Sequence, residues 1–361
     1  MKDLQSKKSE PSLYGIVHSN RNFKDKDSWG KNQFNSSFPV ALCCYMRDKG
    51  HTAMYVSVKK GIPGVSEMSF DDVFGTNLPN AQLKFLFESP YDPYREYVED
   101  AMEKIDVVIT EAESGKYLMP LEIKLTTLPD NGTSSLPESE YGSEIVVRSA
   151  TMRYVALGMA SRLNAQQRED VRKIFHPVCV DIQDWENVFE MRQRREAIFK
   201  ALDTFLIKYE KLQCPLVMQP VWKTKGKSPE LADNCLDVFV WSDFALARCL
   251  FMDAQGGSNE ITAAQGRLFQ LVRFLYEFSA RGRVFQHPIF DGMRYDDDEE
   301  DVSSTKIAFR HVSQLLQNVR FKNPVVRKRE LKNMVSDGGR LLLRPSYGFA
   351  DMVFAATKCC A

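Results

Sequence analysis

The chain has 361 residues, of which 43% are hydrophobic and 27% charged, a composition typical of globular proteins with a substantial core. Lysine plus arginine number 48, as do aspartate plus glutamate, so no overall positive charge points to nucleic acid, although local basic patches can still bind it. No segment is apolar enough to cross a bilayer and the N-terminus lacks the apolar run of a signal peptide, so a cytoplasmic location is expected.

The N-terminal stretch, residues 14–39, is dense in amides and cations and carries several aromatic residues. Arginine and lysine suit guanine and asparagine or glutamine suit adenine, so such a stretch could contact base edges and phosphates. An ordered loop that caps the core is the alternative. The candidate DNA-contacting residues are Asn20, Arg21, Lys31, Asn32, Gln33 and Asn35.

A short helix is expected over residues 39–50, ending at Gly50, followed by strands over 52–60 and 82–88. Residues 91–104 are then expected to form a helix that leads directly into the next strand. Four acids here are either solvated or additional metal ligands: Glu88, Glu96, Glu99 and Glu103.

Residues 105–126 alternate between apolar and polar positions and predict a hairpin that turns at Ser114 and Gly115. When the apolar faces of its two strands are buried together, Asp106, Glu122 and Lys124 share the other face. Two carboxylates can hold Mg²⁺ against a phosphate, and a lysine can orient the attacking water. A solvated strand face is the alternative, because Glu-x-Lys is a common pattern.

The pattern recurs at Glu330 and Lys332, but no acid-bearing apolar strand precedes that copy. The hairpin also sets a geometric condition. A strict two-residue turn would pair Asp106 with Ile123 and place the acid on the wrong face. We therefore expect an odd loop or a bulge between Thr110 and Leu118.

Beyond a turn-rich loop, a helix is expected over residues 143–163, with Arg153 on its exposed side or near phosphate. Further helices are expected over 166–176, 185–213, 261–282 and 305–319, and the helix over 261–282 is closed by Gly282. A strand and a basic loop are expected over 215–234. A buried strand that leads into a helix is expected over 236–251, where Asp237 and Asp243 offer an alternative acidic site. No Walker loop, G-x-S-x-G elbow, dinucleotide fingerprint or zinc spacing is found.

The segment SLYGIVHSNRNFKDKDSWGKNQFNSSFPVALCCYM, together with LEIKLTTLPD, resembles the HindVP-like family of type II restriction endonucleases over most of the chain. The resemblance implies an α/β (α+β) fold of the PD-(D/E)XK nuclease type, with a mixed sheet flanked by helices and a helix-rich C-terminal portion. It also implies Mg²⁺-dependent double-strand cleavage at the palindrome GRCGYC, a homodimer whose two-fold axis matches that of the DNA, and a cognate DNA methyltransferase.

Carried over residue by residue, the motif's acids fall on Asp106 and Glu122, the metal ligands, and its lysine falls on Lys124. The sequence departs from the motif at Ile105, where proline is usual. We expect residues 13–165 to form the catalytic core with its DNA-contact segment, and 166–361 to pack on it as one continuous unit. Two other readings stay open: a repair or junction-resolving nuclease on the same core, and a non-catalytic DNA-binding or scaffold protein.

Overall fold

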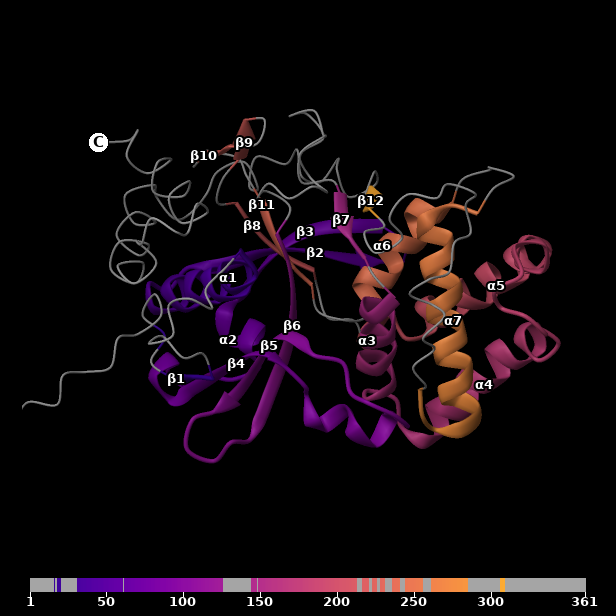
Figure 1. Ribbon diagram of the computed structural model, residues 1–361, viewed down its shortest axis with the longest axis horizontal. Helices are drawn as coiled ribbons and strands as arrows, with labels where there is room; N and C mark the ends of the chain where they lie inside the picture. Colours follow the sequence, from indigo (N-terminus) through magenta and orange to yellow (C-terminus); the bar gives the residue numbers. More distant parts are fainter. Residues whose placement is uncertain are drawn as a thin grey trace, which may run out of the picture.

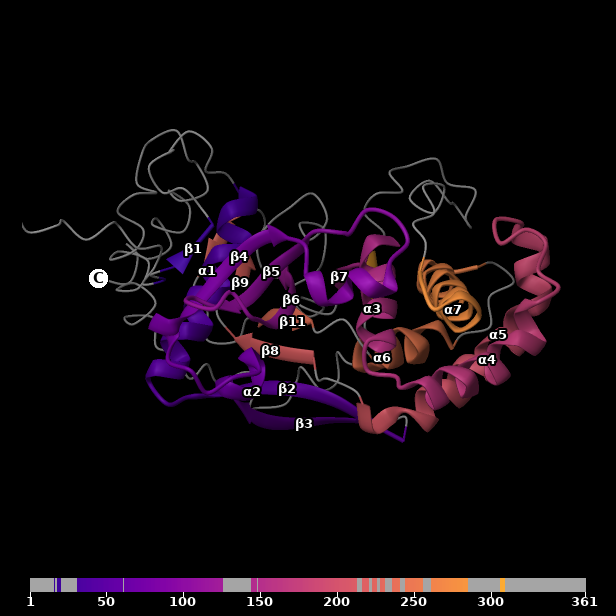
Figure 2. The ribbon, with the colours of Figure 1, turned by 90° about the horizontal axis from the view of Figure 1, so that it is seen from below.

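The computed structural model describes residues 16, 18–20, 31–60, 62–125, 144–147, 149–212, 216–220, 223–225, 228–230, 236–240, 244–255, 261–284 and 306–308. Within these residues, a mixed sheet of eight strands forms the centre of the molecule (Figure 2). All neighbouring strands are antiparallel except the first pair. In spatial order the strands are β1 (His18–Ser19), β4 (Leu83–Ser89), β5 (Ile105–Glu111), β6 (Tyr117–Leu125), β11 (Leu236–Val240), β8 (Leu216–Pro220), β2 (Thr52–Lys59) and β3 (Ile62–Ser69).

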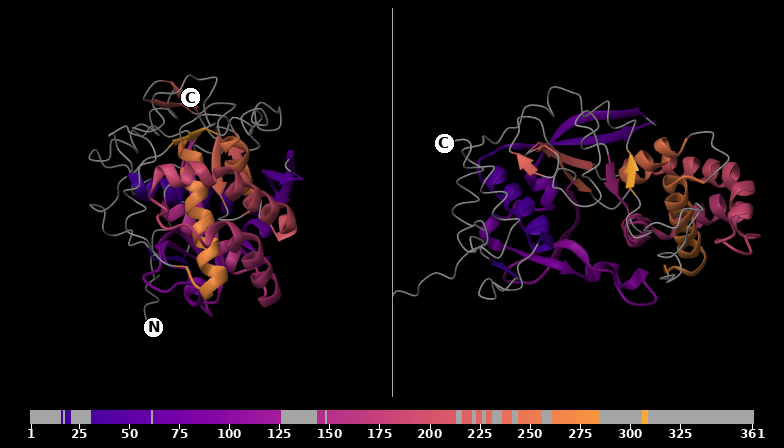
Figure 3. Two further views of the ribbon diagram at one scale, coloured as in Figure 1. Left: turned by 90° about the vertical axis from the view of Figure 1, so that its right-hand side faces the viewer. Right: turned by 45° about the horizontal axis from the view of Figure 1, so that its top comes forward.

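Helices lie on two sides of this sheet, the first two on one side and the later five gathered on the other (Figure 1). The α-helices are α1 (Lys31–Asp48), α2 (Phe70–Phe74), α3 (Ser149–Ala160), α4 (Ala165–Cys179), α5 (Val188–Lys208), α6 (Phe244–Ala254) and α7 (Ala263–Arg281). Short 3-10 helices are η2 (Asn80–Gln82), η3 (Asp92–Tyr97) and η5 (Glu210–Leu212). Two small ladders join β9 (Lys223–Lys225) to β10 (Ser228–Glu230) and β7 (Glu144–Val146) to β12 (Lys306–Ala308), the second pair visible side by side in Figure 3.

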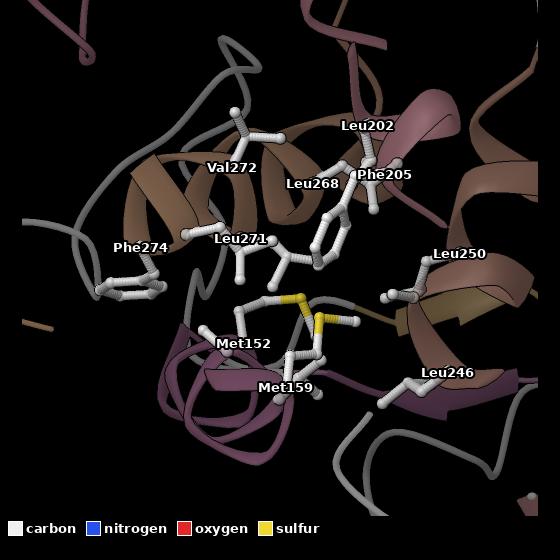
Figure 4. Close-up of a cluster of buried hydrophobic side chains, with 14 of the residues drawn as sticks. Met152, Met159, Leu202, Phe205, Leu246, Leu250, Leu268, Leu271, Val272 and Phe274 are labelled. Carbon is white, nitrogen blue, oxygen red and sulfur yellow. The ribbon is translucent and has the colours of Figure 1, made fainter. Parts of the chain in front are cut away.

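The larger core joins α3, α4, α5, α6 and α7 (Figure 4). Met152 and Met159 of α3 face Leu268 and Leu271 of α7, and Phe205 of α5 inserts between the helices. The helix ends are specified locally. Thr262 and Gln265 form a capping box at the start of α7, and Gly282, with φ of 77°, ends the helix as the sequence predicted.

A second, smaller core lies between the sheet and the helices α1 and α2. The ring of Phe74 on α2 contacts that of Phe85 on β4, with 5.7 Å between centroids, and α1 contacts β6. Val107 of β5 and Leu121 of β6 are buried on this side, whereas Val108 belongs to the larger core. Val107 and Val108, neighbours in β5, therefore belong to different cores, as the period of two requires.

Several expected elements differ from those observed. The first helix begins at Lys31 and contains Pro39, so it starts eight residues earlier than expected. The helix expected over 91–104 is only the 3-10 helix η3, with Pro93 in its first turn. In the helix expected over 143–163, residues 144–146 instead form β7, and residues 306–308 of the last expected helix form β12.

Two strands from the portion expected to be helix-rich, β8 and β11, complete the central sheet between β6 and β2. Residues 166–361 therefore contribute to the same sheet as the hairpin. No helix among the described residues has both the length and the apolar character needed to span a membrane.

Candidate active site

The register of the β5–β6 hairpin decides which side chains share a face. Ile109 pairs with Met119 but Thr110 pairs with Tyr117, so Leu118 is an extra residue on β6 and forms a bulge. The bulge expected from the sequence is confirmed. It shifts the register by one residue, which is the shift that brings the two acids to the same face.

The turn beyond the bulge is held by local hydrogen bonds. The N–H of Gly115 donates to the carbonyl of Glu111 (3.0 Å), and the Ser114 hydroxyl donates to the Glu111 carboxylate (2.6 Å). Gly115 has φ of 70°, in the left-handed region that glycine adopts without strain. Gly115 lies in the turn that the sequence predicted at Ser114 and Gly115.

The register of the hairpin places Asp106 and Glu122 on the same face. The paired residues of β5 and β6 end with Val107 and Leu121, and continuing this register by one residue sets Asp106 opposite Glu122. Both acids are partly buried, and the N–H of Ile123 donates to Oδ2 of Asp106 at 2.7 Å, which fixes the orientation of that carboxylate.

Lys124 is described at the level of its backbone. It pairs with Val238 of β11, while Glu122 pairs with Val240, so both occupy positions of the same parity in β6. Asp237, the alternative acid, pairs with Leu125 at a position of the opposite parity, away from Glu122. Asp243 lies outside the described residues. The register therefore brings Asp106, Glu122 and the Lys124 position together and separates them from Asp237.

Of the additional acids named from the sequence, Glu88 lies on β4 between Phe87 and Ser89. These two residues pair with Val107 and Ile105, so the backbone of Glu88 lies beside Asp106. The other three lie elsewhere. Glu103 accepts from the Nη1 of Arg153 at 3.1 Å, whereas Glu96 and Glu99 line an open surface pocket beside Arg283. In the part of the chain that the structure describes, no three Asp, Glu, His or Cys side chains form a metal-binding cluster. The carboxylate pair is thus the acidic feature that the described residues offer to a metal here.

Arg153 was expected on the exposed side of its helix or near phosphate, and this expectation is wrong. The residue is 1% exposed and its guanidinium binds Asp100, Glu103 and the carbonyl of Ala101. These three residues immediately precede β5. Arg153 therefore fixes α3 to the segment that leads into Asp106.

A group of tyrosines lies between α3 and the hairpin. The ring of Tyr94 contacts those of Tyr91 and Tyr154, with centroids 4.9 and 5.8 Å away, and Tyr91 also contacts Tyr117 on β6 at 5.5 Å. Burial raises the pKa of Tyr154 well above its ordinary value, and Tyr94, Glu122, Asp106 and Tyr91 raise it further. Helical periodicity alone does not distinguish Tyr154 from the core residues of its helix, because it cannot tell a packed ring from a hydroxyl that points toward a site.

Of the candidate DNA-contacting residues, Asn20 is the one whose side-chain contacts are described. Its carboxamide donates to the carbonyl of Phe87 (3.0 Å) and accepts from the N–H of Phe87 (2.8 Å), which fastens it to the strand β4. Lys31, Asn32, Gln33 and Asn35 occupy the first turns of α1, where only the backbone is described, and Arg21 lies outside the described residues.

Comparison with known proteins shows the family to which this chain belongs. The family model for the HindVP restriction endonuclease matches residues 29–359. This chain belongs to that family. It is 35% identical over 341 residues to the type II restriction enzyme HgiDI of Herpetosiphon aurantiacus, with 93% of each chain covered. It is 32% identical over 352 residues to the probable type II restriction enzyme HindVP of Haemophilus influenzae, with 97% of this chain and 95% of the relative covered.

No solved structure matches the chain. As a member of the HindVP restriction endonuclease family, the protein is a type II restriction enzyme, a site-specific deoxyribonuclease that acts on DNA. The family implies the nuclease fold, and the observed mixed sheet flanked by helices agrees with the fold expected from the sequence. Enzymes of this type generally use divalent metal ions.

Proposed function

We propose that this enzyme makes Mg²⁺-dependent double-strand cuts at a short palindromic DNA site, with GRCGYC as the candidate sequence. The observation that carries the proposal is the opposed pair Asp106 and Glu122, brought to one face by the Leu118 bulge. Two carboxylates fit Mg²⁺, because this ion is usually bound through one or two carboxylates, with waters and substrate phosphate completing its shell.

In this proposal Asp106 and Glu122 hold the metal. When bound, Mg²⁺ would supply positive charge against the scissile phosphate and lower the pKa of a coordinated water. Asp106 is held in place by the N–H of Ile123, so its carboxylate is already oriented before substrate binds. Lys124 positions or helps deprotonate the attacking water and stabilises the charge that develops on the phosphate, and the 3′ oxygen leaves.

For DNA recognition we propose the N-terminal segment, with Asn20, Arg21, Lys31, Asn32, Gln33 and Asn35 as the contacting residues. Asn20 also joins this segment to β4, since both ends of its carboxamide bind the Phe87 backbone. The others are tested by alanine substitution with binding measured on matched and mismatched duplexes. A base contact should cost about 1–3 kcal/mol on the matched site alone, whereas a phosphate contact should weaken binding to all sequences about equally.

A palindromic site cut on both strands implies two copies of the chain related by a two-fold axis, so we propose a homodimer. A cellular enzyme of this activity also requires protection of its host's own sites, which supports a partner methyltransferase of the same specificity. Residues 13–165 and 166–361 act together in each copy, because β8 and β11 continue the sheet that carries the hairpin. Sedimentation of the protein with one duplex site tests the stoichiometry, and one chain per site would contradict the dimer.

The deciding experiment is digestion of unmethylated plasmid DNA with Mg²⁺ and with a chelator, followed by sequencing of the ends. Discrete fragments with one common end sequence are expected with Mg²⁺ only. Glu122→Ala and Lys124→Ala should abolish cleavage and leave site-specific binding in place, while Lys116→Ala, in the exposed turn of the same hairpin, should cleave normally. Selective cutting of branched DNA would instead indicate a junction-resolving nuclease, and wild-type rates in both site variants would refute the residue assignment.

A further inference from the structure

The hydroxyl of Tyr154 is a buried polar group with no hydrogen-bond partner among the described residues. Tyr154 lies in the middle of α3 and is 3% exposed, so water does not supply the missing partner at the surface. Buried hydroxyl groups in folded proteins are nearly always hydrogen-bonded, and an exception calls for an explanation in terms of strain, catalysis or a ligand.

The groups around the hydroxyl indicate which partner it could bind. The charged groups that act on Tyr154 are Glu122 and, more weakly, Asp106, and both raise its pKa beyond the effect of burial. The remaining neighbours that do so are Tyr94 and Tyr91. Tyr154 is therefore within electrostatic reach of both carboxylates, and its hydroxyl is a group that can donate a hydrogen bond to them.

The position of the side chain is fixed from several directions. Arg153, the preceding residue of α3, is bound to Asp100 and Glu103. The Tyr154 ring packs edge-on against Tyr94, and Tyr91 beside it donates its hydroxyl to the carbonyl of Leu118 on β6 at 3.4 Å. These contacts link α3 to the bulged strand, so the hydroxyl is held close to the hairpin face that carries Asp106 and Glu122.

We propose that Tyr154 is a positioning residue of the endonuclease, whose buried hydroxyl donates a hydrogen bond to the Glu122 carboxylate when metal and DNA occupy the site. Glu122 is assigned as the acceptor because it lies on β6, the strand that the tyrosine group contacts through Tyr117 and Leu118. Hydrogen bonds around a reacting centre are often long before substrate binds and shorten in the complex. This inference rests on the proposed function of Glu122 as a metal ligand.

The test is Tyr154→Phe, which keeps the ring and removes only the hydroxyl. Single-turnover cleavage should fall about 10–100-fold, the usual effect of losing a residue that orients a metal ligand. The affinity for Mn²⁺, followed by electron paramagnetic resonance without turnover, should fall with it. Metal-free DNA binding should not change, and the melting temperature should be unchanged or higher, since no hydrogen bond of the free protein is lost.

The matched control is Tyr209→Phe. Tyr209 is also buried in the helical layer, but its hydroxyl donates to the carbonyl of Gln167 at 3.2 Å, away from the carboxylates. This substitution should lower the melting temperature and leave cleavage and Mn²⁺ affinity unchanged. A purely structural role for Tyr154 would give the same pattern in both variants and would overturn the inference.

The inference and the proposed function fail in different ways. If Glu122→Ala cleaves DNA at the wild-type rate, the metal site is elsewhere and the role of Tyr154 falls with it. If Glu122→Ala is inactive while Tyr154→Phe cleaves DNA and binds Mn²⁺ like the wild type, the site stands and only the role of Tyr154 is refuted.

Discussion

The two faces of the β5–β6 hairpin are made by the same two strands and have different tasks. Toward α1 and α2, Val107, Ile109 and Leu121 are each at most 1% exposed and form an apolar core. Toward α3, the acids Asp106 and Glu122 remain partly exposed. Successive residues of a strand alternate between the two faces. If one strand slipped by one residue against the other, its apolar and acidic residues would change faces while those of the other strand would not. The bulge at Leu118 therefore serves the acidic face, while the apolar face holds both strands in place.

This contrast predicts that substitutions on the two faces have separable effects. A change on the acidic face should reduce cleavage by a correctly folded protein. A change on the apolar face should reduce the amount of folded protein, and the molecules that remain folded should cleave normally. The variants below test this separation.

The largest effect is expected for Asp106→Asn. An amide oxygen can still accept from the N–H of Ile123, so the free energy of unfolding should change little, but the negative charge is lost. Single-turnover cleavage should fall by about 10⁴-fold or more, as for other residues that act directly in catalysis. Glu113→Gln, in the exposed turn of the same hairpin, is the control and should be fully active. Near-normal cleavage by Asp106→Asn would break the assignment of the acidic face.

On the apolar face, Ile109→Ala should destabilise the protein by about 3–4 kcal/mol, because it removes buried methyl groups and leaves a cavity. Ile109 is fully buried opposite Met119, which packs under the end of α2 at Gly75. Chemical denaturation measures the loss, and the cleavage rate is scaled to the folded fraction. A cleavage defect larger than the loss of folded protein would show that the two faces are coupled.

Arg153→Met tests the link between α3 and the start of β5. It removes the guanidinium that binds Asp100 and Glu103 but keeps most of the buried side-chain volume. Breaking a buried ion pair typically costs about 3–5 kcal/mol, and we expect about 2–3 kcal/mol here because both carboxylates are partly exposed and can be hydrated. Arg172→Ala removes an exposed pair with Glu169 and should change stability by less than about 1 kcal/mol. Equal losses in the two variants would contradict this account.

The hairpin could be predicted from the sequence in some detail because its information is local. Alternation gave the two faces, and the condition that Asp106 and Glu122 share one of them required the bulge, which is present. The end of α7 at Gly282 was equally local, since a left-handed residue after a helix is a property of one position. The strand register alone was therefore enough to predict that Asp106 and Glu122 share a face.

What could not be predicted depends on partners distant in the chain. No local pattern says that β11 and β8 insert between β6 and β2, because neighbours in a sheet need not be neighbours in sequence. The burial of Arg153 depends on acids about fifty residues earlier, and the placement of the Tyr154 hydroxyl depends on which face of the sheet α3 covers. The sequence of α3 alone therefore does not distinguish the roles of Arg153 and Tyr154, because these roles depend on how the helix packs.

The smallest effect is expected at the turn. Gly115→Ala places a Cβ where nothing lies within 4 Å, so no clash arises, but φ of 70° is unfavourable for any residue with a side chain. The cost should be about 1–2 kcal/mol in the free energy of unfolding. Gly64→Ala, in β3, is the control: its Cβ also meets open space and its φ is not positive, so it should be neutral or slightly stabilising. Cleavage by folded Gly115→Ala should stay normal, because the bulge at Leu118 sets the register of the acids. If instead cleavage falls while the protein stays folded, the turn and not the bulge holds Asp106 opposite Glu122.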